Sequence, residues 1–259
     1  MTYIARVNPL YLAAIACFAA KNDTRYYLNG ICITPHHEKG VLLVATDGTL
    51  IGAMHDPDGW VAEEIIVSTP NAAILKACKA RGTKAKTQKL DRRPSSATPG
   101  KPGAALAWIG ADRILISAIA EIEPEPEAFG RYVLAQDASK LIDGKFPNWR
   151  QAMQVKPGEY DPSIMPHLNA AVLQPFLDAA RILARESEAP IELRSRGENA
   201  VVNVYMGRTE LRDLFFGAAM PMRGDVRPID HLPAFITNLP QPKKPRARVV
   251  DGKLVAATA

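Results

Sequence analysis

Two histidines and two aspartate–glycine pairs are the first residues in this 259-residue chain whose types suggest chemistry. The neighbouring His36 and His37 could ligate a metal ion, because imidazole nitrogen is a common zinc ligand. No Cys, Asp or third His stands near them at a ligand-like spacing, so a solvated turn is the favoured interpretation. Asp47-Gly48 and Asp143-Gly144 are typical of tight turns, in which Gly accepts a positive φ angle. We therefore predict no metal and no cofactor.

The stretch Val41–Leu50, VLLVATDGTL, resembles the phosphatase motif of the haloacid dehalogenase family, a strand that ends in Asp-x-Asp-Gly-Thr. In that family the first Asp attacks phosphorus and the second handles the proton. Ala45 occupies the nucleophile's position here, so the resemblance lacks its chemistry. The chain also has no Gly-rich phosphate loop. We expect a protein that is not an enzyme, and a haloacid-dehalogenase-like phosphatase is the most remote alternative.

The basic residues favour binding over catalysis. Lys76 and Lys79 share one face of a predicted helix, and Arg181 and Arg185, four apart, share a face of another. Such rows contact phosphates as point charges, or they form a solvated helix face. Between Lys76 and Lys101 nine Lys or Arg residues accompany a single acid. The formal net charge of +5 leans mildly toward an anionic partner.

Hydrophobic spacing predicts an α+β protein with three long helices. Asn8 followed by Pro9 is typical of a helix start, and this helix is expected to run to about Ala20. Thr69-Pro70 predicts a second helix, to about Arg81. The third runs to about Arg185 and must start late or kink at Pro175. Apolar and β-branched runs predict strands at Thr2–Val7, Tyr26–Thr34, Val41–Thr46, Leu50–His55, Glu64–Ser68, Ala104–Ile109, Arg113–Ile119, Arg131–Leu134, Ile191–Arg194, Ala200–Met206 and Leu211–Ala219.

The predicted elements repeat. Asn169-Ala-Ala-Val-Leu173 echoes Asn71-Ala-Ala-Ile-Leu75, at the start of the third and second helices. The chain therefore divides into three units, each a strand, a helix and three strands, the third beginning near Ile164. A low-complexity, basic segment at 83–103 is expected to be a flexible insertion in the second unit. Beyond Gly224 the chain is Pro-rich and basic, and Val249–Val255 could close a small hairpin.

Four short stretches, in order, are similar to the bacterial DNA polymerase III beta sliding clamp family. They are Arg25-Tyr-Tyr-Leu-Asn-Gly30, Val44-Ala-Thr-Asp-Gly48, Leu141-Ile-Asp-Gly-Lys-Phe-Pro-Asn-Trp-Arg150 and Met220-Pro-Met-Arg223. The resemblance implies the DNA-clamp fold, with helices on one face of continuous antiparallel sheets. It implies a complete clamp domain at 1–155, like the middle domain of the beta clamp. A half domain at 156–224 and a tail at 225–259 follow.

The resemblance also implies two binding surfaces. Family members encircle duplex DNA, which lies along helices rich in Lys and Arg, and tether polymerases as processivity factors. The residues that would contact DNA without reading bases are Lys76, Lys79, Arg81, Arg181 and Arg185. Partner peptides dock in a cleft beside the middle domain, and the matching positions are Leu28, Thr46, Gly48, Ile51, Pro147, Arg150, Met220, Pro221, Met222 and Arg223. We expect Leu28, Ile51, Pro147 and Met222 to converge in one apolar pocket.

The chain departs from the family in two respects. Thr49-Leu50 stands where His-Arg is usual, which changes the polar rim of the cleft. The chain also has no counterpart of the family's first domain, which suggests a shortened clamp from a phage or mobile element. Family rings hold six domains, or twelve units, so four chains of three units would close one. A tetramer is therefore expected, with a dimer as the alternative. A clamp loader is a further expected partner.

Composition sets the remaining expectations. With 47% hydrophobic and 23% charged residues, the chain resembles a globular protein. Cys17, Cys32 and Cys78 are odd in number and unpaired in spacing, which favours a reduced, cytoplasmic protein. No run is long enough for a membrane span. A peptide-binding interaction protein that never encircles DNA is the leading alternative to a sliding clamp.

Overall fold

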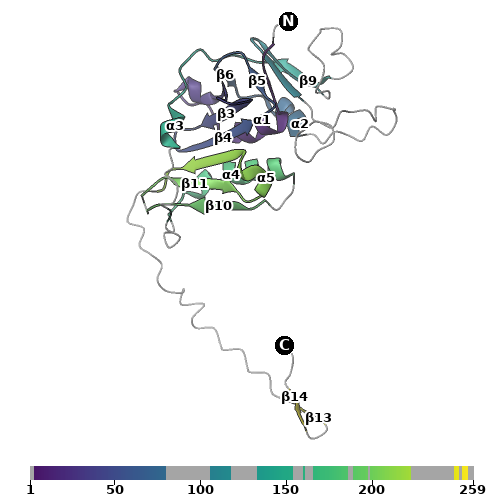
Figure 1. Ribbon diagram of the computed structural model, residues 1–259, viewed down its shortest axis with the longest axis vertical. Helices are drawn as coiled ribbons and strands as arrows, with labels where there is room; N and C mark the ends of the chain where they lie inside the picture. The colour runs from purple at the N-terminus through teal and green to yellow at the C-terminus, as the bar shows by residue number, and fades with distance from the viewer. Residues whose placement is uncertain are drawn as a thin grey trace, which may run out of the picture. The chain divides into compact units, whose positions relative to one another are not determined.

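The structure is a computed structural model that describes residues 3–79, 106–117, 133–153, 160, 166–185, 189–197, 199–222, 248–250 and 253–255. The chain divides into two compact units, Met1–Arg223 and Gly224–Ala259. In the smaller unit, β13 (Arg248–Val250) and β14 (Lys253–Val255) pair antiparallel, so the predicted hairpin is present. Figure 1 shows the strands and helices of the larger unit, which carries every feature discussed below.

The larger unit opens with a strand, a helix and three strands. Asn8 caps the first helix, because its side chain accepts the N–H of Leu10, and Pro9 takes the first helical position. The elements are β1 (Tyr3–Val7), α1 (Pro9–Ile15), the 3₁₀ turns η1 (Ala16–Phe18) and η2 (Tyr26–Asn29), β2 (Gly30–Pro35), β3 (Val41–Thr46), β4 (Leu50–Asp56) and β5 (Trp60–Val61).

Two further repeats follow. The second has β6 (Ile65–Ser68), α2 (Ala72–Lys79), β7 (Leu106–Gly110), β8 (Arg113–Ser117), β9 (Val133–Ala138) and the short α3 (Trp149–Ala152). In the third, Asn169 caps α4 (Ala170–Ala184) as predicted, and Pro175 lies inside this helix. Then come β10 (Ile191–Arg194), β11 (Val202–Met206), the short α5 (Thr209–Arg212) and β12 (Phe215–Ala219). The strand expected near Ile164 and the insertion at 83–103 lie outside the described residues.

The strands form two antiparallel sheets, and the first two units exchange strands between them. The five-stranded sheet has the order β5-β1-β7-β8-β9, and the seven-stranded sheet has the order β10-β11-β12-β4-β3-β2-β6. Thus β1 lies beside β7 of the second unit, while β6 lies beside β2 of the first. The third unit extends the second sheet through the pairing of β12 with β4. The fold is the predicted α+β clamp architecture.

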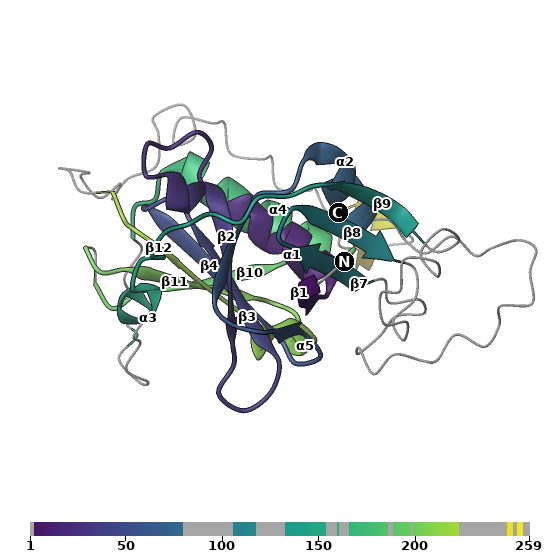
Figure 2. The ribbon, with the colours of Figure 1, turned by 90° about the horizontal axis from the view of Figure 1, so that it is seen from above.

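The long helices α1 and α4 cover one face of the seven-stranded sheet. Figure 2 shows α1 and α4 side by side against the strands of the seven-stranded sheet. Phe18 and Phe176 meet edge to face there, with ring centroids 4.9 Å apart. Their rings lie over two glycines, Gly52 and Gly217, which are paired across β4 and β12. A second apolar cluster, around Ile51, Phe146 and Ala218, lies on the opposite face of the same sheet.

The first unit differs from the sequence prediction in two places. Tyr26–Asn29 forms the 3₁₀ turn η2 rather than the start of a strand, although its residues are strand formers. The side chain of Asn29 bonds both the N–H and the C=O of Asp23, and these local bonds hold the chain in a turn. The first helix also ends earlier than Ala20, because its last turn tightens into η1.

Two later elements differ as well. The second helix starts at Ala72, where Asn71 rather than Thr69 acts as the cap and accepts the N–H of Ile74. Thr69 is engaged elsewhere, since its hydroxyl donates to the Asn29 carbonyl at 2.9 Å. The predicted strand Leu211–Ala219 starts later than expected, because the connector from β11 winds into α5, which ends at Arg212, and β12 begins only at Phe215.

Candidate functional site

A pocket of about 230 Å³ opens on the seven-stranded sheet, on the face away from the helices. Its floor crosses the junction of the first and third units, where Ile51 of β4 pairs with Ala218 of β12. Pro147, Asn148 and Trp149, which lead into α3, form one wall. The whole lining is Arg25, Tyr27, Leu28, Thr46, Gly48, Thr49, Leu50, Ile51, Pro147, Asn148, Trp149, Val201, Ala218, Ala219 and Met220. The pocket is therefore built from all three repeats.

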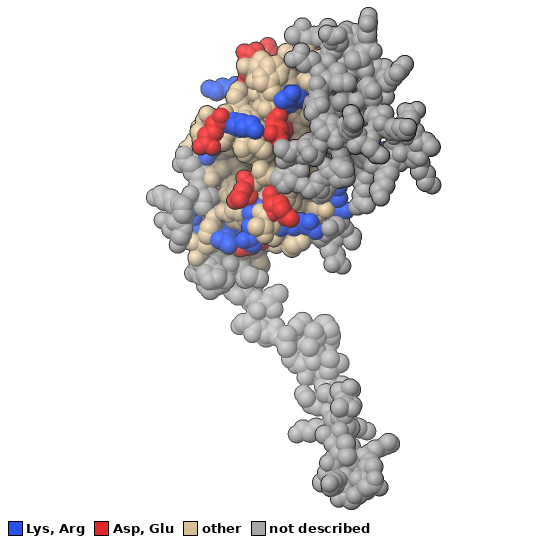
Figure 3. Space-filling view, turned by 45° about the vertical axis from the view of Figure 1, so that its right-hand side comes forward, with Lys and Arg blue, Asp and Glu red and all other residues tan. Residues whose placement is uncertain are grey.

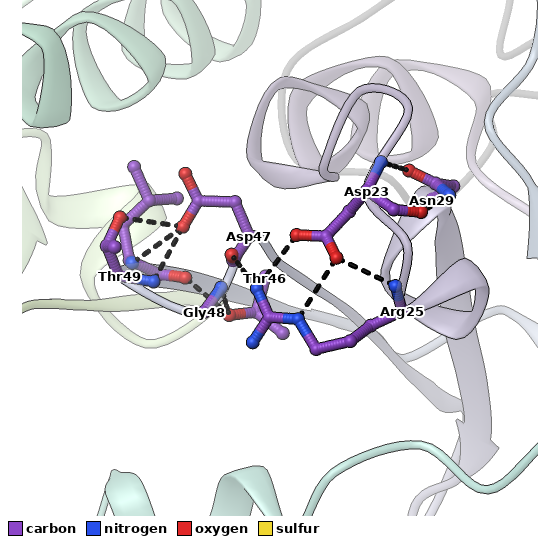
Figure 4. A network of polar contacts seen from close by, with 8 residues as sticks. Asp23, Arg25, Asn29, Thr46, Asp47, Gly48 and Thr49 are labelled. Carbon is purple, nitrogen blue, oxygen red and sulfur yellow. Dashed lines mark hydrogen bonds and ion pairs between the residues drawn. The ribbon is translucent and has the colours of Figure 1, made fainter.

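The β3–β4 turn forms a second, rigid wall. One carboxylate oxygen of Asp47 accepts the N–H groups of Thr49 at 2.7 Å and Leu50 at 3.0 Å, together with the Thr49 hydroxyl at 2.8 Å (Figure 4). Gly48 has a φ of +95°, which only Gly adopts without strain. Thr46 adds a hydroxyl bond of 2.6 Å to the Leu50 carbonyl. Asp47 thus stabilises a turn, as the sequence predicts.

Arg25 completes this wall. Its guanidinium makes two bonds to the Asp23 carboxylate, of 3.0 and 2.8 Å, and one of 3.2 Å to the Asp47 carbonyl. These hydrogen bonds from Arg25 lower the pKa of Asp23 to about 2. A Cβ at Gly48 would lie only 2.9 Å from the guanidinium, so the glycine allows Arg25 to lie flat against the turn. One cation is consequently held at the rim of an otherwise apolar pocket.

Six of the ten cleft positions named from the sequence line this pocket: Leu28, Thr46, Gly48, Ile51, Pro147 and Met220. Arg150 does not, and its guanidinium lies 4.5 Å from the Trp149 ring centroid. Pro221 and Met222 are also absent from the lining, and Arg223 lies outside the described residues. Whether any of these residues binds a partner stays a proposal.

Met222 is expected to line the pocket together with Leu28, Ile51 and Pro147. In the structure Met220 lines it instead. The N–H of Met220 still donates to the Thr49 carbonyl, so the chain keeps its place beside β4 up to this residue. Pro221 has no N–H to continue the ladder. The chain then leaves the sheet, and the N–H of Met222 donates to the His167 carbonyl at 2.7 Å. Leu28, Ile51 and Pro147 do converge.

The sequence analysis missed several lining residues. Arg25, Asn148 and Trp149 lie inside stretches already matched to the clamp family, and Ala218 and Ala219 directly precede another. Counting every residue of each match would have included the first three, and extending the last match by two residues would have included Ala218 and Ala219. Val201 carried no such signal, because its place depends on how β11 pairs with β12.

The predicted DNA-contacting cations lie on the helices. Lys76 and Lys79 are exposed on α2, on the side opposite the buried Ile74 and Cys78. On α4, Arg181 is exposed and lies 3.7 Å from Asp178. Arg185 ends α4 in the left-handed conformation and is partly buried. Arg81 lies outside the described residues.

On the side of the molecule that Figure 3 shows, charge does not mark a binding face. Basic and acidic side chains are interspersed there. α1 adds no cation to the helical layer, since all seven of its residues are buried. Any attraction of this layer for an anion therefore depends on α2 and α4.

The histidines form a stack beside the β2–β3 turn. His36 lies between His37 and His55, at centroid distances of 4.2 and 4.3 Å. Burial, followed by the charges of its two neighbours, lowers the pKa of His36. Among the described residues, no group of three or more His, Cys, Asp or Glu side chains is arranged to hold a metal ion. In the same part of the chain, no helix combines the length and apolarity that a membrane span needs.

Solved structures similar to this one are bacterial sliding clamps. The beta sliding clamp of C. crescentus matches with a TM-score of 0.54 and 14% identity, over 86% of this chain and 66% of that one. The H. pylori beta clamp, solved with diflunisal, matches with a TM-score of 0.52 and 11% identity, over 86% and 67%. The Pseudomonas aeruginosa clamp bound to griselimycin has a TM-score of 0.46 and 15% identity, over 84% and 64%.

These likenesses define the class of fold. The likenesses to the C. crescentus and H. pylori clamps show that the described residues have the fold of the beta sliding clamps, as the four sequence stretches implied. The chain spans under two thirds of the length of the first of these relatives. No protein-family model matches the sequence, and no curated protein matches it either.

Proposed function

We propose that this protein is a sliding clamp that encircles duplex DNA and tethers a polymerase, or another replication protein, as a non-enzymatic processivity factor in the cytoplasm. The observation that carries the proposal is the placement of two surfaces on opposite faces of one sheet. α2, with Lys76 and Lys79, packs beside α1 and against β8 and β9 of the five-stranded sheet, while α4, with Arg181, lies with α1 on one face of the seven-stranded sheet. The apolar pocket lies on the other. A protein built this way can hold DNA and a partner at once.

The helical face suits loose, sequence-independent contact. Lys and Arg on a helix surface attract phosphates without reading bases, so the attraction weakens steeply as salt rises. Arg181 lies beside Asp178, which reduces its pull on a phosphate. We therefore propose weak direct attraction to DNA, with retention supplied by topological linkage.

The pocket suits a short apolar peptide from the partner. Its lining is dominated by Leu28, Ile51, Ala218 and Met220, with the Arg25 cation at the rim. Small apolar pockets of this kind concentrate binding energy in one or two anchor side chains. A polymerase peptide with a large apolar residue followed by an acidic group would match this arrangement.

Ring closure requires more than one chain. Each chain supplies three of the twelve repeats that a six-domain ring holds, so four chains complete it, with a clamp loader opening the ring on closed DNA. β9 and β10 each stand at one end of a sheet, and the proposed contacts between chains use these two edges. The proposed assembly is a tetramer with two kinds of joint.

Retention on circular DNA tests this function. A clamp that encircles DNA stays on a nicked plasmid after a salt wash and slides off once the plasmid is cut. Lys76→Glu, Lys79→Glu and Arg181→Glu together should reduce binding to short duplex at least tenfold, since each reversal removes an attraction to phosphate. The matched control reverses Lys39, Lys140 and Lys145, three exposed lysines outside the helices.

The outcomes separate the two leading functions. Equal loss in both triple variants would contradict a DNA-facing helical layer. Peptide binding with no retention on circular DNA would favour the alternative, a clamp-like interaction protein that never encircles DNA.

A further inference from the structure

Among the described residues, the strand that follows the long helix has a partner on its outer side in the first two repeats but not in the third. In each repeat one strand directly follows the long helix in the chain: β2 after α1, β7 after α2 and β10 after α4, the η turns aside. β6 pairs with the outer side of β2, and β1 pairs with the outer side of β7. Within the residues that the structure describes, no strand pairs with the equivalent side of β10. β10 is thus the position at which the repeat pattern lacks a partner.

The backbone of β10 presents hydrogen-bonding groups at this edge. The N–H of Gly207 donates to the Pro190 carbonyl at 2.8 Å, so the backbone carbonyl of Pro190 points toward β11. Backbone groups alternate in direction along an antiparallel strand. Glu192 and Arg194 therefore bond toward β11, while Ile191 and Leu193 direct their N–H and C=O groups away from it. Leu193 is also 42% exposed.

The charges on β10 are arranged so that two antiparallel copies of the strand can place opposite charges beside one another. Glu192 and Arg194 project on the face away from the helices, because Leu193 between them pairs with the buried Val204 on the helical side. In one chain the two side chains form an ion pair with a 2.5 Å separation. Both remain partly exposed, at 35% for Glu192 and 45% for Arg194. They can therefore also meet charges on a strand placed alongside.

We propose that β10 pairs antiparallel with β10 of a second copy of this chain, about a two-fold axis through Leu193. Symmetric pairing requires a residue to face its own counterpart. A centre at Glu192 would oppose two carboxylates, and a centre at Arg194 would oppose two guanidinium groups, both of which are unfavourable. A centre at Leu193 instead places each Glu192 opposite Arg194 of the other copy. It also aligns the outward backbone groups of the two Leu193 residues.

The helical side supports the same contact. Leu173 and Leu177, one turn apart on α4, are only partly buried. A two-fold axis perpendicular to the sheet keeps both copies of α4 on the same face. Their apolar flanks and the two Leu193 side chains then come together and leave water. The contact is an isologous one, in which each copy contributes the same surface.

Mixing two charge-reversed chains tests the register. Glu192→Arg alone and Arg194→Glu alone each place like charges opposite one another in a self-pair, so each should halve the particle mass measured by light scattering. An equimolar mixture pairs Arg with Glu at every position and should restore the mass. Single variants that keep the full mass, or a mixture that stays halved while both chains remain folded by circular dichroism, would overturn the proposal.

A cross-link tests the contact without altering charge. Leu193→Cys should form a disulfide-linked dimer under mild oxidation, because the two positions face each other across the axis. Leu141→Cys replaces a leucine of similar exposure away from β10 and is the matched control. A Leu193→Cys chain that links no more than this control would overturn the proposal, even if the charge variants fail to fold.

This inference rests on the proposed ring only for the number of chains in the assembly. A chain that cross-links at position 193 but is not retained on circular DNA supports the contact and refutes the ring. A chain retained on circular DNA without that cross-link leaves the ring standing and refutes the contact.

Discussion

The pairing of β4 with β12, here called the seam, and the outer edge of β10 are both places where one sheet can join another, yet their chemistry is opposite. At the seam, Gly52 faces Gly217, and the rings of Phe18 and Phe176 fill the space where their side chains would be. At the edge, an ion pair stands on one face and a single leucine on the other. Because buried apolar side chains hold the seam together, we expect it to stay formed throughout the native state. Exposed charges make the edge selective and sensitive to salt, because their energy is small and screened.

The seam is also where the pocket lies. Ile51 and Ala218 meet on the face opposite the phenylalanine rings, so the same pair of strands supports the core on one side and the pocket on the other. A change that loosens the seam should therefore affect stability and peptide binding together. A change at the β10 edge should affect neither. The predictions below test this separation.

The largest effect is expected from Phe176→Ala. This ring is fully buried and contacts Phe18, so its loss should lower the free energy of unfolding by about 3–5 kcal/mol. Urea denaturation with an unchanged slope measures it. Phe216→Ala, on β12 and partly exposed on the face away from Phe176, is the control and should lose clearly less. Equal losses would mean that the rings do not hold the seam.

A smaller loss is expected from Gly217→Ala. The added Cβ would overlap the Phe176 ring, and overpacking of this kind costs about 1–3 kcal/mol. Gly197→Ala is the control, because its Cβ would meet only the Ala200 side chain at 3.8 Å. Combining Gly217→Ala with Phe176→Leu should recover part of the loss, since the two sites share one space. Strict additivity would argue against that shared space.

The pocket itself offers a contrast between two methionines. Met220→Ala should weaken binding of a polymerase-derived peptide by about 1–2 kcal/mol, or roughly tenfold, with little change in stability. Met222→Ala, at a similarly exposed residue outside the lining, should leave the affinity unchanged. Fluorescence polarisation with a labelled peptide measures both. A larger effect at Met222 would place the peptide elsewhere.

The smallest effect concerns Arg25 and pH. Asp23 has a pKa lowered to about 2 by its hydrogen bonds to Arg25, so this contact stabilises the fold above the carboxyl's ordinary pKa. The stabilisation is lost as pH falls through about 2. Arg25→Ala should return the pKa of Asp23 toward its ordinary value near 3.8, followed by NMR titration. An unchanged titration would show that Arg25 does not hold the carboxylate.

The framework of the fold could be predicted because its signals are local. Asn8 and Asn169 cap helices as their sequence contexts indicate, and Asp47-Gly48 turns the chain between β3 and β4. The failures have tertiary causes. Tyr26–Asn29 has the composition of a strand, yet two bonds from the Asn29 side chain wind it into a turn. The strand exchange of β1 and β6 also leaves no trace in hydrophobic spacing, because both are simply apolar strands.

The pocket could be predicted in outline but not in detail. Leu28, Ile51 and Pro147 come from stretches that resemble the clamp family and lie far apart in the sequence. In the structure they line one pocket. The exchange of Met222 for Met220 depends on where β12 leaves the sheet, which Pro221 and the His167 carbonyl decide. Val201 lies in the wall only because β11 pairs beside β12. Such placements depend on strand pairing, which the residue types do not encode.

The position of β1 between β5 and β7 has a consequence for how the chain reaches its native state. β2, β3 and β4 are hairpin neighbours and can pair as soon as they leave the ribosome. β1 must wait for β7, because its partner residues Ala107 and Trp108 follow it by about a hundred positions. Until then, the Ala5 and Val7 side chains lack part of their cover. Newly made protein should therefore pass through a stage in which β2, β3 and β4 are paired and the five-stranded sheet is still unmade, and that stage is where a chaperone would be needed most.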